Sequence, residues 1–216
     1  QGLATLSTVF FVKTPALTTA SLSKINDTGI TNCANNTTWF NDCSQSNLLS
    51  FAELSQDAEV GRDYLVASAQ ITKKGAGSAG FDFSKVQSCV QDNVTGLMWE
   101  AKTTDGGTHE ATKTYAWYST NYLTNGGDIG ESKNGQNTES FIKQVNTEKL
   151  CGYQDWRLPN KAELDSIINY GVISPTIDSQ YFVNTQNGYY WTADSVANGT
   201  TSAWAINFRE GGESAS

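Results

Sequence analysis

Residues 155–164 read Asp155-Trp156-Arg157-Leu158-Pro159-Asn160-Lys161-Ala162-Glu163-Leu164, and this stretch indicates the fold more clearly than any other. Asn160 suits the N-cap of a helix, and Glu163 stands three residues later, which is the spacing of a capping box. Gly171 is a residue type that ends helices. We therefore expect a helix that begins after Asn160 and closes at Gly171. Its expected buried stripe comprises Leu164, Ile167 and Ile168.

Other periodic segments complete an α+β pattern. Residues 139–151 place apolar side chains toward one face of a second helix, namely Phe141, Val145 and Leu150. Short runs of β-branched and aromatic residues predict strands, because such residues fit the pleated surface of a sheet. These runs are residues 94–100, 115–118, 189–193 and 203–208. Two helices, several short antiparallel strands and long loops are typical of an α+β fold.

The tryptophans that accompany these elements have two readings. Their rings could stack on sugars, but each sits in a strand or at a helix entrance, which favours the core. We expect these four to be structural: Trp99, Trp156, Trp191 and Trp204. Arg157 lies between Trp156 and Leu158, where an arginine more often anchors a loop to a carboxylate or to carbonyls than binds a ligand.

Composition and charge exclude some classes of partner. The chain has 216 residues, a net charge of −8 and no run of lysine or arginine. Nucleic acid demands clustered positive charge, so we expect no nucleic-acid partner. Anionic membranes and highly sulfated glycans are disfavoured for the same reason. The acidic surface suits a soluble exported protein.

Cysteine usage points to an oxidising compartment. The number of cysteines is even and no C-x-x-C pair is present, so disulfides are favoured over zinc or four free thiols. Of the three pairings that four cysteines allow, we favour two bridges: Cys33–Cys43, which closes a polar loop, and Cys89–Cys151, which ties the segment before Trp99 to the end of a helix.

Residues 1–20 differ from the rest of the chain. The apolar run from Gly2 to Val12 is shorter than the roughly 20 residues that span a bilayer, so we expect a strand and no transmembrane span. We divide the chain into an N-terminal extension, 1–20, and a domain, 21–216. The extension could pack on its own domain or on a neighbour. The residues expected to serve assembly are Leu3, Leu6, Val9, Phe10, Phe11 and Val12.

Several motifs together resemble one bacterial extracellular domain family, typified by the C-terminal domain of the Legionella collagen-like adhesin. The motifs are Asn26-Asp27-Thr28-Gly29, residues 56–63, Gly80-Phe81-Asp82-Phe83, residues 92–100, residues 155–160, Ile177-Asp178, and the strands of Trp191 and Trp204. The resemblance implies a C-type-lectin-like domain on an extracellular or cell-surface protein. Members of that family usually continue to a closing strand after the last tryptophan strand. Residues 209–216 lack the expected pattern, so either the sequence is truncated or a sheet position is left open.

Candidate ligand contacts are aromatic residues in or beside loops. Aromatic side chains are enriched at binding surfaces, which selects Trp39, Tyr118, Tyr122, Tyr189 and Tyr190. A structural calcium ion is the only cofactor considered, with oxygens from Asp57, Glu59 and Asp63 beside Asp82; an acidic loop that is solvated or paired with arginine is the alternative.

The chain shows no sign of catalysis. His109 is the only histidine, and it stands in a glycine-rich loop without a nucleophile turn, so we expect an exposed loop histidine and no enzyme. Two functions follow from these observations. The first is a non-catalytic surface adhesion domain that recognises a glycan or a surface protein. The second is a structural subunit of a pilus-like filament or oligomer that self-associates through its N-terminal strand.

Overall fold

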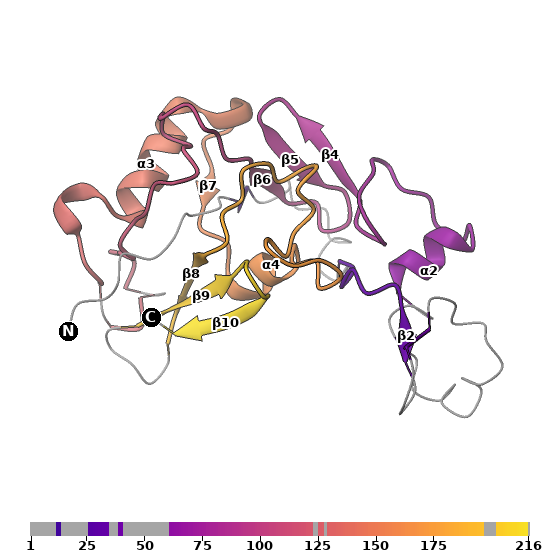
Figure 1. Cartoon of the computed structure of the whole chain (residues 1–216). Helices are drawn as coiled ribbons and strands as arrows, with labels where there is room; N and C mark the ends of the chain where they lie inside the picture. The colour runs from indigo at the N-terminus through magenta and orange to yellow at the C-terminus, as the bar shows by residue number, and fades with distance from the viewer. Residues whose placement is uncertain are drawn as a thin grey trace.

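The computed structural model describes residues 12–13, 26–34, 39–40, 61–122, 125–127, 129–196 and 202–215, which form a mixed α and β domain with antiparallel sheets and few helices (Figure 1). In these ranges the helices are α2 (Arg62–Ala67), α3 (Thr138–Glu148) and α4 (Lys161–Asp165), with 3-10 helices at Lys133–Gly135 and Leu150–Gly152. The strands are β1 (Val12–Lys13), β2 (Cys33–Ala34), β3 (Trp39–Phe40), β4 (Phe83–Val86), β5 (Cys89–Asp92), β6 (Met98–Glu100), β7 (Trp156–Arg157), β8 (Tyr189–Ser195), β9 (Ala203–Asn207) and β10 (Gly212–Ala215).

The strands form two larger sheets and one short pair. The five-stranded sheet has the order β4-β5-β6-β1-β7, the three-stranded sheet has the order β10-β9-β8, and β2 pairs with β3. All of these pairings are antiparallel. In Figure 1, α3 lies beside β7, and α4 lies close to the three-stranded sheet.

Strand alternation divides the core into two clusters. Because neighbouring residues of a strand face opposite sides of the sheet, Trp99 joins one cluster and Met98 joins the other. In the three-stranded sheet Tyr190 and Trp191 divide in the same way. The two clusters therefore join the sheets and helices into one body.

The structure confirms how α4 begins and corrects where it ends. Asn160 accepts a hydrogen bond from the backbone N–H of Glu163, and the Glu163 carboxylate accepts one from the N–H of Asn160. The helix stops at Asp165 rather than near Gly171. Gly171 instead approaches another loop, since a Cβ atom there would lie 2.2 Å from the carbonyl oxygen of Gly29.

Helix α3 matches its prediction within a few residues. It begins at Thr138 behind an Asn137 capping box and ends where Lys149 adopts a left-handed conformation, with φ of 55°. A separate 3-10 helix follows it. The expected inward-facing residues Phe141, Val145 and Leu150 are all buried.

The expected strand 94–100 is shorter than its sequence pattern. Asp92 binds the N–H groups of Val94 and Thr95 and the Thr95 hydroxyl, which bends the chain into a turn and leaves only Met98–Glu100 as strand. Residues 115–118 make isolated bridges through Ala116 and Tyr118 rather than a regular strand. The strands expected at 189–193 and 203–208 are present as β8 and β9.

The open sheet position expected at the end of the sequence is filled. Strand β10 pairs antiparallel with β9, with Glu213 opposite Ile206. The pattern was overlooked because its side chains are mostly exposed and carry no apolar alternation. Helix α2 also lacked a sequence prediction.

The Cys89–Cys151 disulfide that the sequence predicts is present. It joins the first residue of β5 to the 3-10 helix after α3, across a separation of 62 residues. The second predicted bridge involves Cys43, which lies outside the described residues.

Of residues 1–20 the structure describes only Val12 and Lys13, which form the strand between β6 and β7. Val12 stands opposite Trp99 on one side and Arg157 on the other, and its side chain is fully buried. Val12, expected to serve assembly, is therefore used within its own sheet. The other five residues expected to serve assembly lie outside the described ranges.

Candidate functional site

A polar groove with a cavity volume of about 480 Å³ lies at one end of the three-stranded sheet. We call it the Tyr189 groove. Its lining comes from three segments that are far apart in the sequence: residues 111–114, residues 186–189, and the pair Asn207 and Arg209. The volume is within the range of small-molecule sites, which hold roughly 300–1,000 Å³.

Sheet pairing fixes two sides of the groove. Tyr189 at the start of β8 stands opposite Asn207 at the end of β9. The N–H of Phe208 donates to the carbonyl of Gly188 at 2.9 Å, and the fully buried Phe208 ring anchors the chain between Asn207 and Arg209. The N–H of Arg209 then donates to the Asn207 side chain at 2.9 Å. The positions of Tyr189, Asn207 and Arg209 are therefore set by the core beneath them.

The third side, residues 111–114, is held by the preceding loop. The N–H of Ala111 donates to the carbonyl of Thr103 at 2.9 Å, and the N–H of Thr103 donates to the carbonyl of His109 at 2.9 Å. The ammonium group of Lys113 donates to the carbonyl of Gly107 at 2.7 Å. This side of the groove therefore depends on the loop 103–110, and we call residues 111–114 the loop wall.

The groove offers an aromatic ring beside amides and cations. The amide-bearing residues are Gln186, Asn187 and Asn207, and the cations are Lys113 and Arg209. The Asn187 side chain has no hydrogen-bond partner among the described residues, and it is exposed. The Arg209 side chain is 65% exposed and lies 3.7 Å from the Glu210 carboxylate. Amides donate and accept hydrogen bonds, so such a lining suits a polar, hydroxyl-bearing ligand.

The structure separates the five aromatic residues that the sequence proposed for ligand contact. Tyr189 lines the groove. Tyr118 is half-buried, Tyr122 is 82% exposed, and neither lines the groove. For Trp39 the described part is the backbone in β3.

The expectation that Tyr190 contacts a ligand is corrected by the structure, because its side chain is fully buried. Neighbouring residues of β8 face opposite sides, so Tyr190 points into one core cluster, whereas Tyr189 at the start of the strand packs partly on the other cluster and also lines the groove. There its ring packs edge-on against Phe208, and its hydroxyl accepts a hydrogen bond from the N–H of Gln186 at 2.8 Å. Tyr190 therefore supports the groove from below.

Sequence reasoning missed the polar residues of the groove. Asn187-Gly188 is a turn signal directly before a predicted strand, and Arg209 directly follows another predicted strand. These positions were visible as loop residues, but the antiparallel pairing that brings them together was not.

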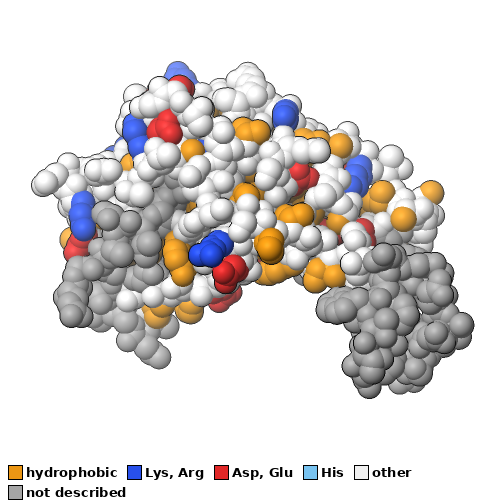
Figure 2. All heavy atoms as spheres, in the orientation of Figure 1, with side chains coloured by type: hydrophobic (Ala, Val, Ile, Leu, Met, Phe, Trp, Pro, Cys, Tyr) orange, Lys and Arg blue, Asp and Glu red, His pale blue; other side chains and the backbone are white. Residues whose placement is uncertain are grey.

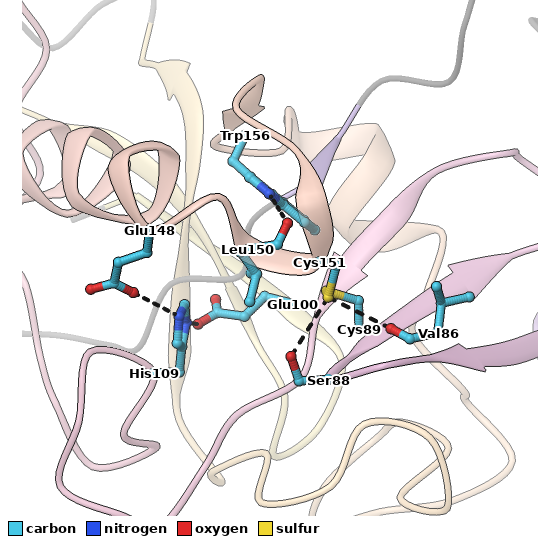
Figure 3. The surroundings of a disulfide bond; sticks show 9 residues. All are labelled: Val86, Ser88, Cys89, Glu100, His109, Glu148, Leu150, Cys151 and Trp156. Carbon is cyan, nitrogen blue, oxygen red and sulfur yellow. Dashed lines mark hydrogen bonds and ion pairs between the residues drawn. A yellow bond between two sulfur atoms is a disulfide. The ribbon is translucent and has the colours of Figure 1, made fainter.

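The structure also corrects the expectation for His109, which is not an exposed loop residue. Its side chain is 16% exposed and lies between two carboxylates, with Nδ1 at 2.6 Å from Glu100 and Nε2 at 3.3 Å from Glu148 (Figure 3). Lys102 binds the other oxygen of Glu100 at 2.9 Å, and both of these side chains are almost fully buried. The loop 103–110 folds back on β6, which sequence spacing alone did not indicate.

The two carboxylates change the protonation of this cluster. Burial lowers the pKa of His109, but the hydrogen bond and charge of Glu100, helped by Glu148, raise it further, so that the pKa ends above its ordinary value of 6.5. Burial also lowers the pKa of Lys102, with partial compensation by Glu100.

The structural motif residues lie where the core meets the helices. Trp99, Trp156 and Trp191 are buried, whereas Trp204 is half-buried with the Lys161 ammonium 4.6 Å from its ring centroid. Arg157 forms a bidentate pair with Glu163 at 2.8 and 2.7 Å. The arginine therefore ties β7 to the first turn of α4, in keeping with an anchoring role.

The residues proposed for calcium are only partly described. Asp57 and Glu59 lie outside the described ranges, and Asp63 stands in the first turn of α2, where its N–H donates to Asp27 at 3.1 Å. Among the described residues no group of three metal-ligating side chains comes together. Asp82 binds the N–H groups of Lys74 and Gly75 at 2.8 and 2.7 Å.

The fold and the groove together define a class: a disulfide-bonded α+β domain that presents a polar pocket at the edge of a small antiparallel sheet. The family described as the Lcl C-terminal domain matches residues 88–216, which is more than half of the chain, and this chain belongs to that family. The family indicates an adhesin-related domain of an extracellular or surface protein. None of the curated proteins and none of the solved structures compared with the chain matches it.

The helices and the surface charge are relevant to the kind of partner. Among the described helices, none combines the length and the apolar character needed to cross a bilayer. On the face drawn in Figure 2, basic and acidic side chains of the described residues are dispersed rather than gathered in a patch of one sign.

Proposed function

We propose that this chain is a non-catalytic adhesion domain of an exported bacterial protein, and that it binds a glycan in the Tyr189 groove. Its body is of the C-type-lectin-like kind, as its family motifs imply. The observation that carries the proposal is the lining of the groove, in which one tyrosine stands among three amide side chains and two cations.

Sugar chemistry fits this lining. One side of a pyranose ring is a patch of C–H groups that packs on an aromatic face, as apolar surface does elsewhere. The ring hydroxyls both donate and accept, and they match the donors and acceptors of Gln186, Asn187 and Asn207. A small concave site of this kind suits one or two sugar units better than the broad surface of a protein partner, which buries roughly 800 Å² on each side.

A glycan array tests the proposal directly. The purified chain should bind a restricted set of glycans, and Tyr189→Ala should lose that binding because the stacking surface is removed. Tyr122→Ala is the matched control, since Tyr122 is an exposed tyrosine outside the groove. Equal binding by both variants would place the ligand elsewhere, and an array without any binding would contradict the glycan proposal.

A second proposed function is a structural subunit of a filament or oligomer. The position of β1 favours it, because Val12–Lys13 fills the space between β6 and β7 and pairs with both. The same segment of a neighbouring copy has the same backbone groups to offer, as in β-strand addition. Electron microscopy of the purified chain should then show oligomers that grow with concentration, and an excess of a synthetic peptide of residues 1–14 should disperse them by competing for the same strand position while the domain stays folded. Particles of monomer size at every concentration would contradict this function.

A further inference from the structure

The loop 103–110 connects the buried charge cluster to the Tyr189 groove. It begins just after Glu100 and Lys102, carries His109 back onto that cluster, and leads directly into the loop wall at Ala111. Ala111 is fully buried, and its N–H is bonded to Thr103 within the same loop. A shift of His109 would therefore be transmitted to the loop wall through two hydrogen bonds of backbone groups.

His109 is held from both sides by carboxylates of different elements. Glu100 belongs to β6 and is fully buried, whereas Glu148 belongs to α3 (Figure 3). A second contact follows the same path, since the Thr108 hydroxyl donates to Glu148 at 2.6 Å. His109 and Thr108 thus tie the loop to the sheet and to the helix.

The charged groups around His109 come from the sheet, the helix and the loop itself. The sheet side contributes the Glu100 carboxylate and the Lys102 ammonium, the helix contributes Glu148, and the loop itself contributes Asp105. The remaining neighbour is neutral, because the Phe141 ring of α3 lies 6.3 Å from the imidazole centroid. With His109 protonated, the charges of Glu100, Lys102, His109 and the exposed Glu148 sum to zero.

The two protonation states of the imidazole differ in what they can hold. An imidazolium ion donates from both nitrogens, so it satisfies Glu100 and Glu148 together. A neutral imidazole keeps one N–H, which belongs on Nδ1 because Glu100 is the closer and fully buried partner. The lone pair of Nε2 then faces the Glu148 carboxylate across 3.3 Å, and attraction between loop and helix becomes repulsion.

We propose that His109 is a proton-controlled clasp that fastens the loop 103–110, and with it the loop wall of the Tyr189 groove, to strand β6 and helix α3. The clasp is closed when the imidazole is protonated and loosens when it is neutral. Its effect on ligand binding rests on the proposed function, whereas the movement of the loop wall does not. The pocket is thus complete in mildly acidic surroundings and loses one ordered side in alkaline ones.

Nuclear magnetic resonance tests the clasp without any ligand. Because His109 is the only histidine of the chain, its ring signals titrate without overlap. The ring should titrate with a midpoint above 6.5, and the amide signals of residues 111–113 should shift with the same midpoint. Above it, the Ala111 amide should lose hydrogen-exchange protection after correction for intrinsic exchange, because the neutral imidazole no longer holds the loop to Glu148.

Two variants separate the clasp from a merely structural histidine. His109→Gln cannot become charged, so the loop wall should lose its dependence on pH. In Glu148→Gln an amide replaces the carboxylate and can either accept from or donate to Nε2, so the loop wall should stay ordered in both states of His109. The proposal would be overturned if the amide signals of the loop wall did not shift with the titration of His109, or if their pH-dependent shift persisted in His109→Gln.

A glycan-binding measurement at two pH values distinguishes the clasp from the proposed function. The glycan selected by the array should bind the wild-type chain more weakly above the His109 midpoint than below it, and Glu148→Gln should bind equally at both pH values. If the loop wall responds to pH but no glycan binds, the clasp stands and the glycan function fails. If a glycan binds equally at both pH values while the loop wall moves, the clasp does not control the groove.

Discussion

Glu163 has two partners at the start of α4: Asn160, which the capping-box spacing predicts, and Arg157, whose anchoring role the sequence predicts without naming its partner. Its carboxylate accepts from the N–H of Asn160 at 2.8 Å and also accepts hydrogen bonds from both terminal guanidinium nitrogens of Arg157. Glu163→Ala removes both contacts, and we expect the free energy of unfolding to fall by about 1–2 kcal/mol, measured by urea denaturation. The Arg157 side chain is 39% exposed, so screening by solvent limits how much the ion pair contributes to the free energy of unfolding.

Lys143→Met is a control for this variant. It breaks the exposed pair between Lys143 and Glu139 on α3, and pairs of that kind contribute little. Its denaturation midpoint should match that of the wild type. An equal loss in both variants would show that the capping box has no special role.

His109 makes the stability of the fold depend on pH. Its pKa in the folded state is raised above the ordinary 6.5 by Glu100 and Glu148 against the effect of burial. The stabilisation is therefore fully present below pH of about 6.5 and is lost as the pH rises through the higher folded-state value. The stability difference between the wild type and His109→Gln should shrink between pH 6 and pH 9 in urea denaturation. A difference that stays constant or grows would contradict the bridge.

Residue-scale prediction succeeded where the signal was local. The capping box and the anchoring arginine depend on neighbours within a few positions, and the sequence displays these directly. Tyr190 and His109 were misjudged because their surroundings come from distant segments. For Tyr190 the alternation of β8 decides the facing, and for His109 a loop must first fold back onto β6.

At the scale of elements, the disulfide joins the first sheet to α3. Cys89 begins β5, and Cys151 lies in the 3-10 helix beyond α3. Replacing both by alanine should lower the free energy of unfolding by about 4 kcal/mol, because the loop they close is long and the unfolded chain regains its freedom. Thermal denaturation of the double variant measures this loss. Addition of a reductant should destabilise the wild type more than the double variant, in which only the predicted Cys33–Cys43 bridge is left to reduce.

If the double variant melts at the wild-type temperature, the contacts of α3 alone hold it on the sheet. Those contacts are substantial, since Phe141 and Val145 are buried and the Tyr115 ring stacks on Phe141 with centroids 4.4 Å apart.

Elements with apolar periodicity were predictable, and elements without it were not. Helix α3 and strands β8 and β9 carry inward-facing apolar side chains, so their positions followed from the sequence. Strand β10 is mostly exposed and α2 is short, so neither leaves a pattern of that kind. The length of α4 was overestimated because Ile167 and Ile168 are buried in the turns after the helix rather than within it.

At the scale of the whole molecule, the groove exists only once the sheet has formed. Its lining joins residues near 112, 188 and 208, and the pairing of β8 with β9 sets the distance between the last two. The sequence predicts Tyr189 as a ligand contact because it is an aromatic residue in or beside a loop. The amides and cations around it could not be, since nothing local relates Lys113 to Asn187 or Arg209.

The groove lies within the part of the chain that matches the family. The segment matched by the Lcl C-terminal domain, residues 88–216, contains all three parts of the lining. The lining of the groove therefore lies wholly within the matched segment. A variant that begins close to residue 88 would however lack β1 and β4, which belong to the five-stranded sheet.

The most direct test is a titration of the isotope-labelled chain with the best glycan from the array, followed by amide chemical shifts. We predict that the largest shifts fall on residues 111–114, 186–189 and 207–209, and that Tyr189→Ala abolishes them while Tyr122→Ala does not. Shifts that gather around Tyr118 and Tyr122, or a glycan bound equally well by Tyr189→Ala, would contradict the assignment of the Tyr189 groove as the binding site.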